Sequence, residues 1–167
     1  MFTSLIKSAA IVLFCSTIFS NIAIAQESKE DKKAAQATAV KNMLEEKKYV
    51  FVATSVSPMS GRTRTLTSRY DLKIFKDTVI SSLPYFGRAY TASIGTTDGG
   101  INFTSTDFEY TETPRKKGGW NIVIKFKDQT DFRQMDITIF ETGSADLRVS
   151  SNTRQSISFS GDIEAGK

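Results

Sequence analysis

The pattern of apolar and polar residues divides this chain of 167 residues into three parts. A short apolar run lies within residues 8–19, a charged segment follows up to Lys48, and from Tyr49 onward the pattern has a period of two. A period of two is typical of strands with one buried and one solvated face, whereas apolar residues three to four apart indicate a helix. The sequence therefore predicts a mainly β protein of the α+β class, with one helix ahead of the strands.

The helix is predicted between Ser28 and Lys48. This segment is rich in Ala, Lys, Glu and Gln, contains no Gly or Pro, and places Ala37, Val40 and Leu44 at helical spacing. The apolar stripe is narrow, so we expect the helix to cover one face or edge of a sheet. The polar residues from Gln26 onward suit a tether that leads into this helix.

Alternating segments separated by turn residues predict about eight antiparallel strands. They are Tyr49–Val56, Tyr70–Phe75, Thr78–Leu83, Ile101–Tyr110, Trp120–Phe126, Met135–Ile139, Ala145–Val149 and Ile157–Ile163. Short turns between the last four favour pairing of consecutive strands. We expect a curved meander or an up-and-down barrel with the helix packed on it. A two-layer β-sandwich is the alternative, because alternation does not show whether the sheet closes.

Three strands carry more specific expectations. Tyr49–Val56 is apolar on both faces, which predicts a cover on each side, with the helix on one of them. Ile101–Tyr110 changes parity, which predicts a bulge near residues 105–107 if it is a single strand. Trp120 shares a face with Ile122 and Ile124, so we expect its indole to be largely buried.

The N-terminus has the features of a secretory signal peptide. Lys7 supplies the positive charge, the apolar run follows, and Ala23-Ile24-Ala25 forms an A-x-A cleavage site. Cleavage after Ala25 predicts a signal peptide at 1–25, a tether and helix at 26–48 and a β domain at 49–167. The protein would then be exported, periplasmic or secreted, without a transmembrane segment in the mature chain. A lipid anchor on Cys15 is the alternative, although Cys15 lies inside the apolar run.

The composition after Ala25 excludes several kinds of chemistry. The only cysteine of the chain is Cys15 and there is no histidine, so a histidine-based serine triad, a thiol nucleophile and the usual zinc site are excluded. We predict no cofactor, no metal and no catalytic residue. A carboxylate-based hydrolase is a weaker alternative, and its candidate acids are Asp98, Asp107, Glu109, Asp128, Asp131 and Asp136.

Charge makes nucleic acid an improbable partner. Removal of residues 1–25 from the 167 takes Lys7 from the 22 basic residues, which leaves 142 residues with 21 basic, 18 acidic and a net charge of +3. The dense basic cluster Arg115-Lys116-Lys117 precedes two glycines and is typical of a solvated hairpin tip. Export also separates the protein from nucleic acid.

The segment Leu83–Tyr90 combines a proline, a glycine, three aromatic residues and an arginine. Pro84 and Gly87 bend the backbone here. With Tyr70-Asp71-Leu72-Lys73 before it and Gly99-Gly100-Ile101-Asn102-Phe103 after it, this segment resembles an uncharacterised family of exported bacterial proteins with a domain of unknown function. The resemblance covers most of the mature chain and implies no assigned activity.

Two classes of function remain from the sequence. In the first, Tyr85, Phe86, Arg88 and Tyr90 bind a small molecule, a glycan or a lipid, with aromatic rings for stacking and a guanidinium for an acidic group. In the second, the curved sheet docks on an envelope protein. A structural alternative also stays open, in which Pro84 and Gly87 form a corner, the aromatic residues cap the core and Arg88 pairs with an acid.

Overall fold

The computed structural model describes residues 30–88 and 99–166. The chain divides into two compact units, Met1–Gln36 and Ala37–Lys167, and the strands belong to the second. A helix runs over residues 30–45, where the apolar spacing predicted one. The strands of the described residues are β1 (Tyr49–Pro58), β2 (Arg64–Phe75), β3 (Thr78–Leu83), β4 (Ile101–Ser105), β5 (Phe108–Pro114), β6 (Trp120–Phe126), β7 (Phe132–Ile139), β8 (Ser144–Ser151) and β9 (Ile157–Ala165).

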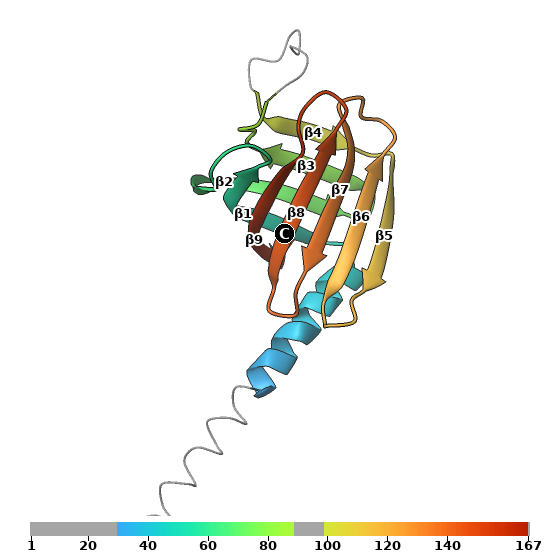
Figure 1. Cartoon of the computed structure of the whole chain (residues 1–167). Helices are drawn as coiled ribbons and strands as arrows, with labels where there is room; N and C mark the ends of the chain where they lie inside the picture. Colours follow the sequence, from blue (N-terminus) through green and yellow to red (C-terminus); the bar gives the residue numbers. More distant parts are fainter. Residues whose placement is uncertain (1–29, 89–98, 167) are drawn as a thin grey trace, which may run out of the picture. The chain divides into compact units, whose positions relative to one another are not determined.

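These strands form one antiparallel sheet of nine strands in the order β4-β3-β2-β1-β9-β8-β7-β6-β5 (Figure 1). Apart from the pairing of β1 with β9, neighbouring strands are consecutive in sequence. The order is that of an up-and-down barrel whose opening lies between β4 and β5 instead of between the first and last strands. The sheet is nearly closed and barrel-like, which confirms the mainly β prediction and its barrel form.

The strand count is nine instead of eight because of one corner. β4 and β5 are the two edge strands of the sheet, and only Thr106 and Asp107 separate them in sequence. The change of parity between Ile101 and Tyr110 is therefore a turn between two strands, and the bulge expected within one strand is wrong. A bulge would keep the chain in one ladder, whereas this corner carries it to the opposite edge.

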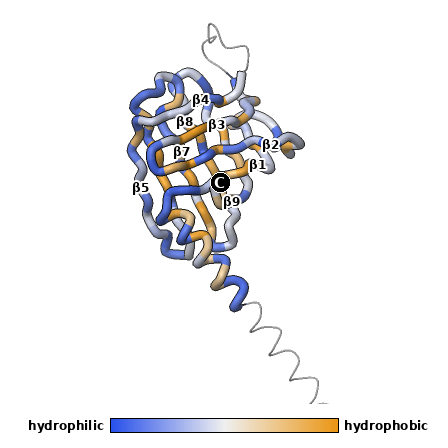
Figure 2. The backbone as a smooth tube through the Cα atoms, turned by 180° about the vertical axis from the view of Figure 1, so that it is seen from behind, coloured by the Kyte–Doolittle hydropathy of each residue, from blue (hydrophilic) through white to orange (hydrophobic). Residues whose placement is uncertain are grey.

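The barrel interior is filled by the alternating apolar side chains of the strands. Figure 2 shows the hydrophobic and hydrophilic residues of the strands by colour along the backbone. Tyr49, Phe51 and Phe159 are the largest of the fully buried side chains. From Ala37 onward the helix contributes Val40 and Leu44 to the same core. Burial of one alternate face of each strand is the physical reason for the period of two in the sequence.

Asp128 joins the corner between β4 and β5 to the β6–β7 turn. The Ser105 hydroxyl donates to Asp128 Oδ1 at 2.6 Å, and the backbone N–H of Thr106 donates to Oδ2 at 2.9 Å. These hydrogen bonds, that of Ser105 foremost, lower the pKa of Asp128 to about 2. We call Ser105, Thr106 and Asp128 the clasp, because they fasten the corner between the two edge strands to the β6–β7 turn.

One local expectation from the sequence holds in part and another is wrong. Trp120 lies on the core side but is only partly buried, because it is the first residue of β6 and pairs with Pro114 at the end of the sheet. The outer face of β1 is not covered by the helix. Its Val50 is 8% exposed and lies in a groove lined by side chains of neighbouring strands, whereas Val40 and Leu44 pack in the core.

Candidate functional site

The predicted ligand-binding segment begins where β3 ends, at Leu83. Pro84 is buried, and the Tyr85 hydroxyl donates to the carbonyl oxygen of Arg88 at 2.8 Å and lies 3.1 Å from that of Gln155. Tyr85 therefore fixes the turn to the β8–β9 connection through its polar end. Tyr90 lies outside the described residues.

Arg154 is the guanidinium that packs against this turn. It is 7% exposed, lies 5.1 Å from the centre of the Tyr85 ring and donates to the carbonyl oxygen of Gly99 at 2.8 Å. A guanidinium over an aromatic face in a buried setting stabilises the packing of both groups. No pattern in the sequence pointed to Arg154, because a single arginine in a polar turn has no periodic neighbours.

Phe86 and Arg88 point to the surface instead. Phe86 is 42% exposed, and its ring lies 5.2 Å from the guanidinium of Arg64 on β2. Arg88 is exposed and forms no ion pair within the part of the chain that the structure describes. Tyr85 thus packs inward while Phe86 and Arg88 lie on the surface. Ligand binding by them stays a prediction.

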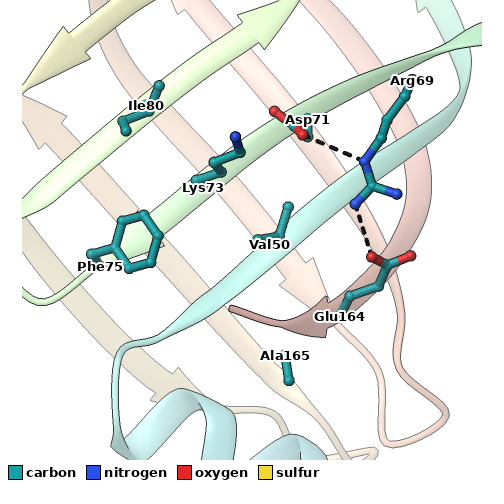
Figure 3. A pocket seen from close by; sticks show the side chains of 8 residues that line it. All are labelled: Val50, Arg69, Asp71, Lys73, Phe75, Ile80, Glu164 and Ala165. Carbon is teal, nitrogen blue, oxygen red and sulfur yellow. Dashed lines mark hydrogen bonds and ion pairs between the residues drawn. The ribbon is translucent and has the colours of Figure 1, made fainter. Parts of the chain in front are cut away.

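A groove on the outer face of the sheet offers a better-formed candidate site (Figure 3). It has a volume of about 590 Å³ and crosses β3, β2, β1 and β9. Ile80, Lys73, Val50 and Glu164 are directly paired across these strands, so they form one row. Arg69, Asp71, Lys73 and Phe75 are alternate residues of β2 and therefore share its outer face.

The charges in the groove are divided into two sets. Arg69 lies between two acids: its Nη2 is 2.8 Å from Glu164 Oε2 and its Nε is 3.6 Å from Asp71 Oδ2. The hydrogen bond that Arg69 donates to Glu164 raises the pKa of Arg69 above its ordinary value. Lys73 is half-buried among Val50, Phe75 and Ile80 and, among the described residues, forms no ion pair. The groove therefore holds one cluster with a net charge of −1, made of Arg69, Asp71 and Glu164, and one ammonium in apolar surroundings.

The sequence contains part of this site. Alternation along Tyr70–Phe75 placed Asp71, Lys73 and Phe75 on one face, but it did not distinguish this face from an ordinary solvated one. Val50 and Glu164 are distant in sequence from β2 and from each other. They join the groove only because β1 pairs with both β2 and β9.

Of the candidate acids of a hydrolase, Asp107, Asp128 and Asp131 lie at the β4–β5 corner and in the neighbouring β6–β7 turn, whereas Glu109 lies on β5 and Asp136 on β7. Asp128 belongs to the clasp, Glu109 pairs with Lys127 at 3.0 Å, and Asp98 lies outside the described residues. Asp136 accepts a hydrogen bond from Gln134 and lines a smaller depression of about 360 Å³ with Asp146. Among the described residues no group of three or more acidic, histidine or cysteine side chains could hold a metal ion.

A search of the described helices finds none with the length and apolar character needed to cross a membrane.

Residues 31–163 match the family model described as a domain of unknown function, DUF4251, and the chain belongs to this family. This confirms the resemblance inferred from the segment Leu83–Tyr90. No curated protein matches.

The fold is similar to that of a solved relative. The crystal structure of a DUF4251 family protein from Bacteroides eggerthii shares 18% sequence identity, with a TM-score of 0.62. The match covers 80% of this chain and 91% of that chain. At this identity the likeness concerns the fold alone.

Proposed function

We propose that this chain is an exported, non-catalytic binding domain that holds a small amphipathic acid in its outer groove. The observation that carries the proposal is the Lys73 ammonium, which lies half-buried among apolar side chains with no acid paired to it in the described residues. The family has no assigned activity, so the argument rests on the groove.

The shape of the groove suits a small ligand with an apolar part. Its volume of about 590 Å³ falls within the range of small-molecule sites, roughly 300–1,000 Å³. Val50, Phe75 and Ile80 supply apolar surface around Lys73 (Figure 3). A short acyl or aryl group would cover these side chains and remove them from water.

The Lys73 ammonium favours an acid over a neutral ligand. Arg69 is engaged by Asp71 and Glu164, so it adds little attraction for an anion. Lys73 can donate to a carboxylate or phosphate, and a hydrogen bond between charged partners is stronger than one between neutral groups. Apolar surroundings strengthen that interaction further, because they exclude water from it.

This proposal can be tested with three probes that share the same octyl-length apolar chain and differ in the head group: octanoate, octyl phosphate and octanol. Titration followed by NMR should shift the backbone amides around Val50 and Lys73 for the two anions and much less for the alcohol. Lys73→Gln should weaken octanoate binding by roughly tenfold, since it removes one charge-assisted hydrogen bond. Lys125→Gln is the matched control, because Lys125 is an exposed lysine on β6, outside the groove.

Three results would refute the groove as a site. They are equal binding of octanol and octanoate, equal loss of affinity in both lysine variants, and the absence of shifts at the groove with all probes.

Export is proposed on the signal sequence alone. The intact mass of protein from the culture's periplasmic or extracellular fraction checks a mature start at Gln26.

A further inference from the structure

A second surface lies at one end of the barrel, away from the groove residues. It comprises Met59, Arg62, Arg64, Phe86 and Arg88, and we call it the arginine end. Met59 and Arg62 lie in the β1–β2 hairpin, Arg64 begins β2, and Phe86 and Arg88 follow β3. None of these residues lines the outer groove.

Contacts in the structure join the segments that form this end. The Arg64 guanidinium lies 5.2 Å from the centre of the Phe86 ring, which connects the hairpin to the segment after β3. The backbone N–H of Gln155 donates to the carbonyl oxygen of Arg88 at 3.1 Å, which connects that segment to the β8–β9 turn. Residues 57–64, 84–88 and 151–156 are therefore neighbours in space.

The charge of these three segments has one sign. They contain Arg62, Arg64, Arg88 and Arg154 and neither Asp nor Glu. Within the described residues, the three exposed arginines of the arginine end form no ion pair. The adjoining β6–β7 turn contains Lys127, Asp128 and Asp131, and Arg133 follows at the start of β7, so the charges of these four residues cancel. The surface therefore presents net positive charge that the described part of the chain does not neutralise.

The same end carries exposed apolar side chains. Met59 is 62% exposed and Phe86 is 42% exposed, and these two are the exposed large hydrophobic residues of the described chain. Their presence at one place, beside unpaired arginines, differs from the scatter expected of ordinary surface residues. An apolar tip surrounded by cations matches the boundary between lipid headgroups and acyl chains.

We propose that the arginine end binds the surface of an anionic lipid bilayer. Arg62, Arg64 and Arg88 would contact lipid phosphates, while Met59 and Phe86 would enter the interface beside them. A soluble polyanion would also attract the arginines, but it offers no apolar layer for Met59 and Phe86. The exposed apolar side chains are thus the reason to favour lipid over an acidic polymer.

Vesicle flotation tests this directly, with phosphatidylglycerol vesicles as the anionic surface and phosphatidylcholine vesicles as the neutral one. We expect binding to phosphatidylglycerol that weakens as salt rises, because salt screens exposed charges. The double variant Arg62→Gln/Arg88→Gln should lower the partition coefficient about 25-fold, because each arginine near an anionic surface contributes about fivefold. The double variant Met59→Ser/Phe86→Ser should also lower the partition coefficient.

The chain contains a control of equal charge at another turn. Lys116 and Lys117 are exposed in the β5–β6 turn, so Lys116→Gln with Lys117→Gln removes the same charge without touching the arginine end. This pair should leave vesicle binding within about threefold of wild type. Thermal unfolding of each variant checks that these exposed substitutions leave the fold intact.

Other outcomes would overturn the proposal. Equal losses from the arginine pair and the lysine pair would show attraction by net charge alone. An unchanged partition for Met59→Ser with Phe86→Ser, together with equally tight binding to heparin, would assign the surface to acidic polymers. Failure of the wild type to float with phosphatidylglycerol vesicles would exclude the lipid surface, and it would leave the groove proposal unaffected because the probes there are soluble.

Discussion

The clasp gives the sharpest prediction about stability. Asp128 accepts hydrogen bonds from the Ser105 hydroxyl at 2.6 Å and from the backbone N–H groups of Thr106 at 2.9 Å and Asp107 at 3.3 Å. Asp128→Asn keeps the size of the side chain but removes the charge and one of the two acceptor oxygens. Both sets of donors then lose a charged acceptor, and either the hydroxyl or the backbone groups face the amide NH2 group in place of an acceptor oxygen.

The loss of stability in these variants follows from the burial of the two residues that share the hydrogen bond, Asp128 and Ser105. Asp128 is exposed, so water screens its charge and reduces the value of each interaction. Ser105, in contrast, is fully buried, and its hydroxyl has no access to water. We expect Asp128→Asn to lower the free energy of unfolding by roughly 1–2 kcal/mol, and Asp128→Ala by roughly 2–3 kcal/mol because it leaves the buried hydroxyl without this acceptor.

The effect should depend on pH in a defined direction. The pKa of Asp128 in the folded protein is about 2, below its ordinary value of 3.8. Its stabilising contribution is therefore complete above about pH 4 and disappears as pH falls through about 2. Urea unfolding of wild type and Asp128→Asn should show a constant difference from neutral pH down to about pH 4 and a shrinking one below it.

Ser105→Ala and the double variant complete a cycle that isolates the pair. We expect the double variant to cost less than the sum of the single ones, because both remove the same hydrogen bond. A difference between wild type and Asp128→Asn that stays constant down to about pH 2 would refute the role of the carboxylate charge. Strict additivity in the cycle would refute the Ser105 contact.

Two further changes test the barrel. Gly161→Ala should destabilise the protein by roughly 1–3 kcal/mol, because the new Cβ would overlap the backbone carbonyl oxygen of Val52. Gly99→Ala is the control: its new Cβ meets nothing within 4 Å, so this variant should be nearly as stable as wild type. Equal urea midpoints for the two variants would contradict the close approach at Gly161. Trp120→Ala should cost roughly 2 kcal/mol instead of the 3–5 typical of a fully buried aromatic residue. Native fluorescence should then be intermediate between buried and exposed indole, and a strongly blue-shifted maximum would disagree.

Several parts of the fold were predictable because they depend on local physics. The clean alternation of Trp120 to Phe126 gave the correct buried face of β6, and the two glycines before it marked the turn. What alternation misses on β6 is the surroundings of its first residue. Alternation shows that Trp120 faces inward, but not that the strand begins at the end of the sheet, where fewer neighbours cover the ring.

The candidate sites also contain residues that the sequence pattern revealed and residues that only the structure revealed. The outer residues of β2 were visible as an alternating set, and Phe86 and Arg88 stood out as unusual. Their partners were not visible, because Val50, Glu164 and Arg64 arrive through pairing and packing between distant segments. Arg154 has no sequence signal, since its burial depends on the rings of Tyr85 and Phe132 around it.

The sequence by itself determined the mainly β class, the helix ahead of the strands and the face that each regular strand buries. These properties follow from periodicity, which reflects solvent exposure residue by residue. The tertiary structure decided that β1 pairs with β9 and that the barrel opens between β4 and β5. Closure depends on contacts between residues far apart in sequence, such as Ser105 with Asp128, and no local pattern encodes which distant segments meet.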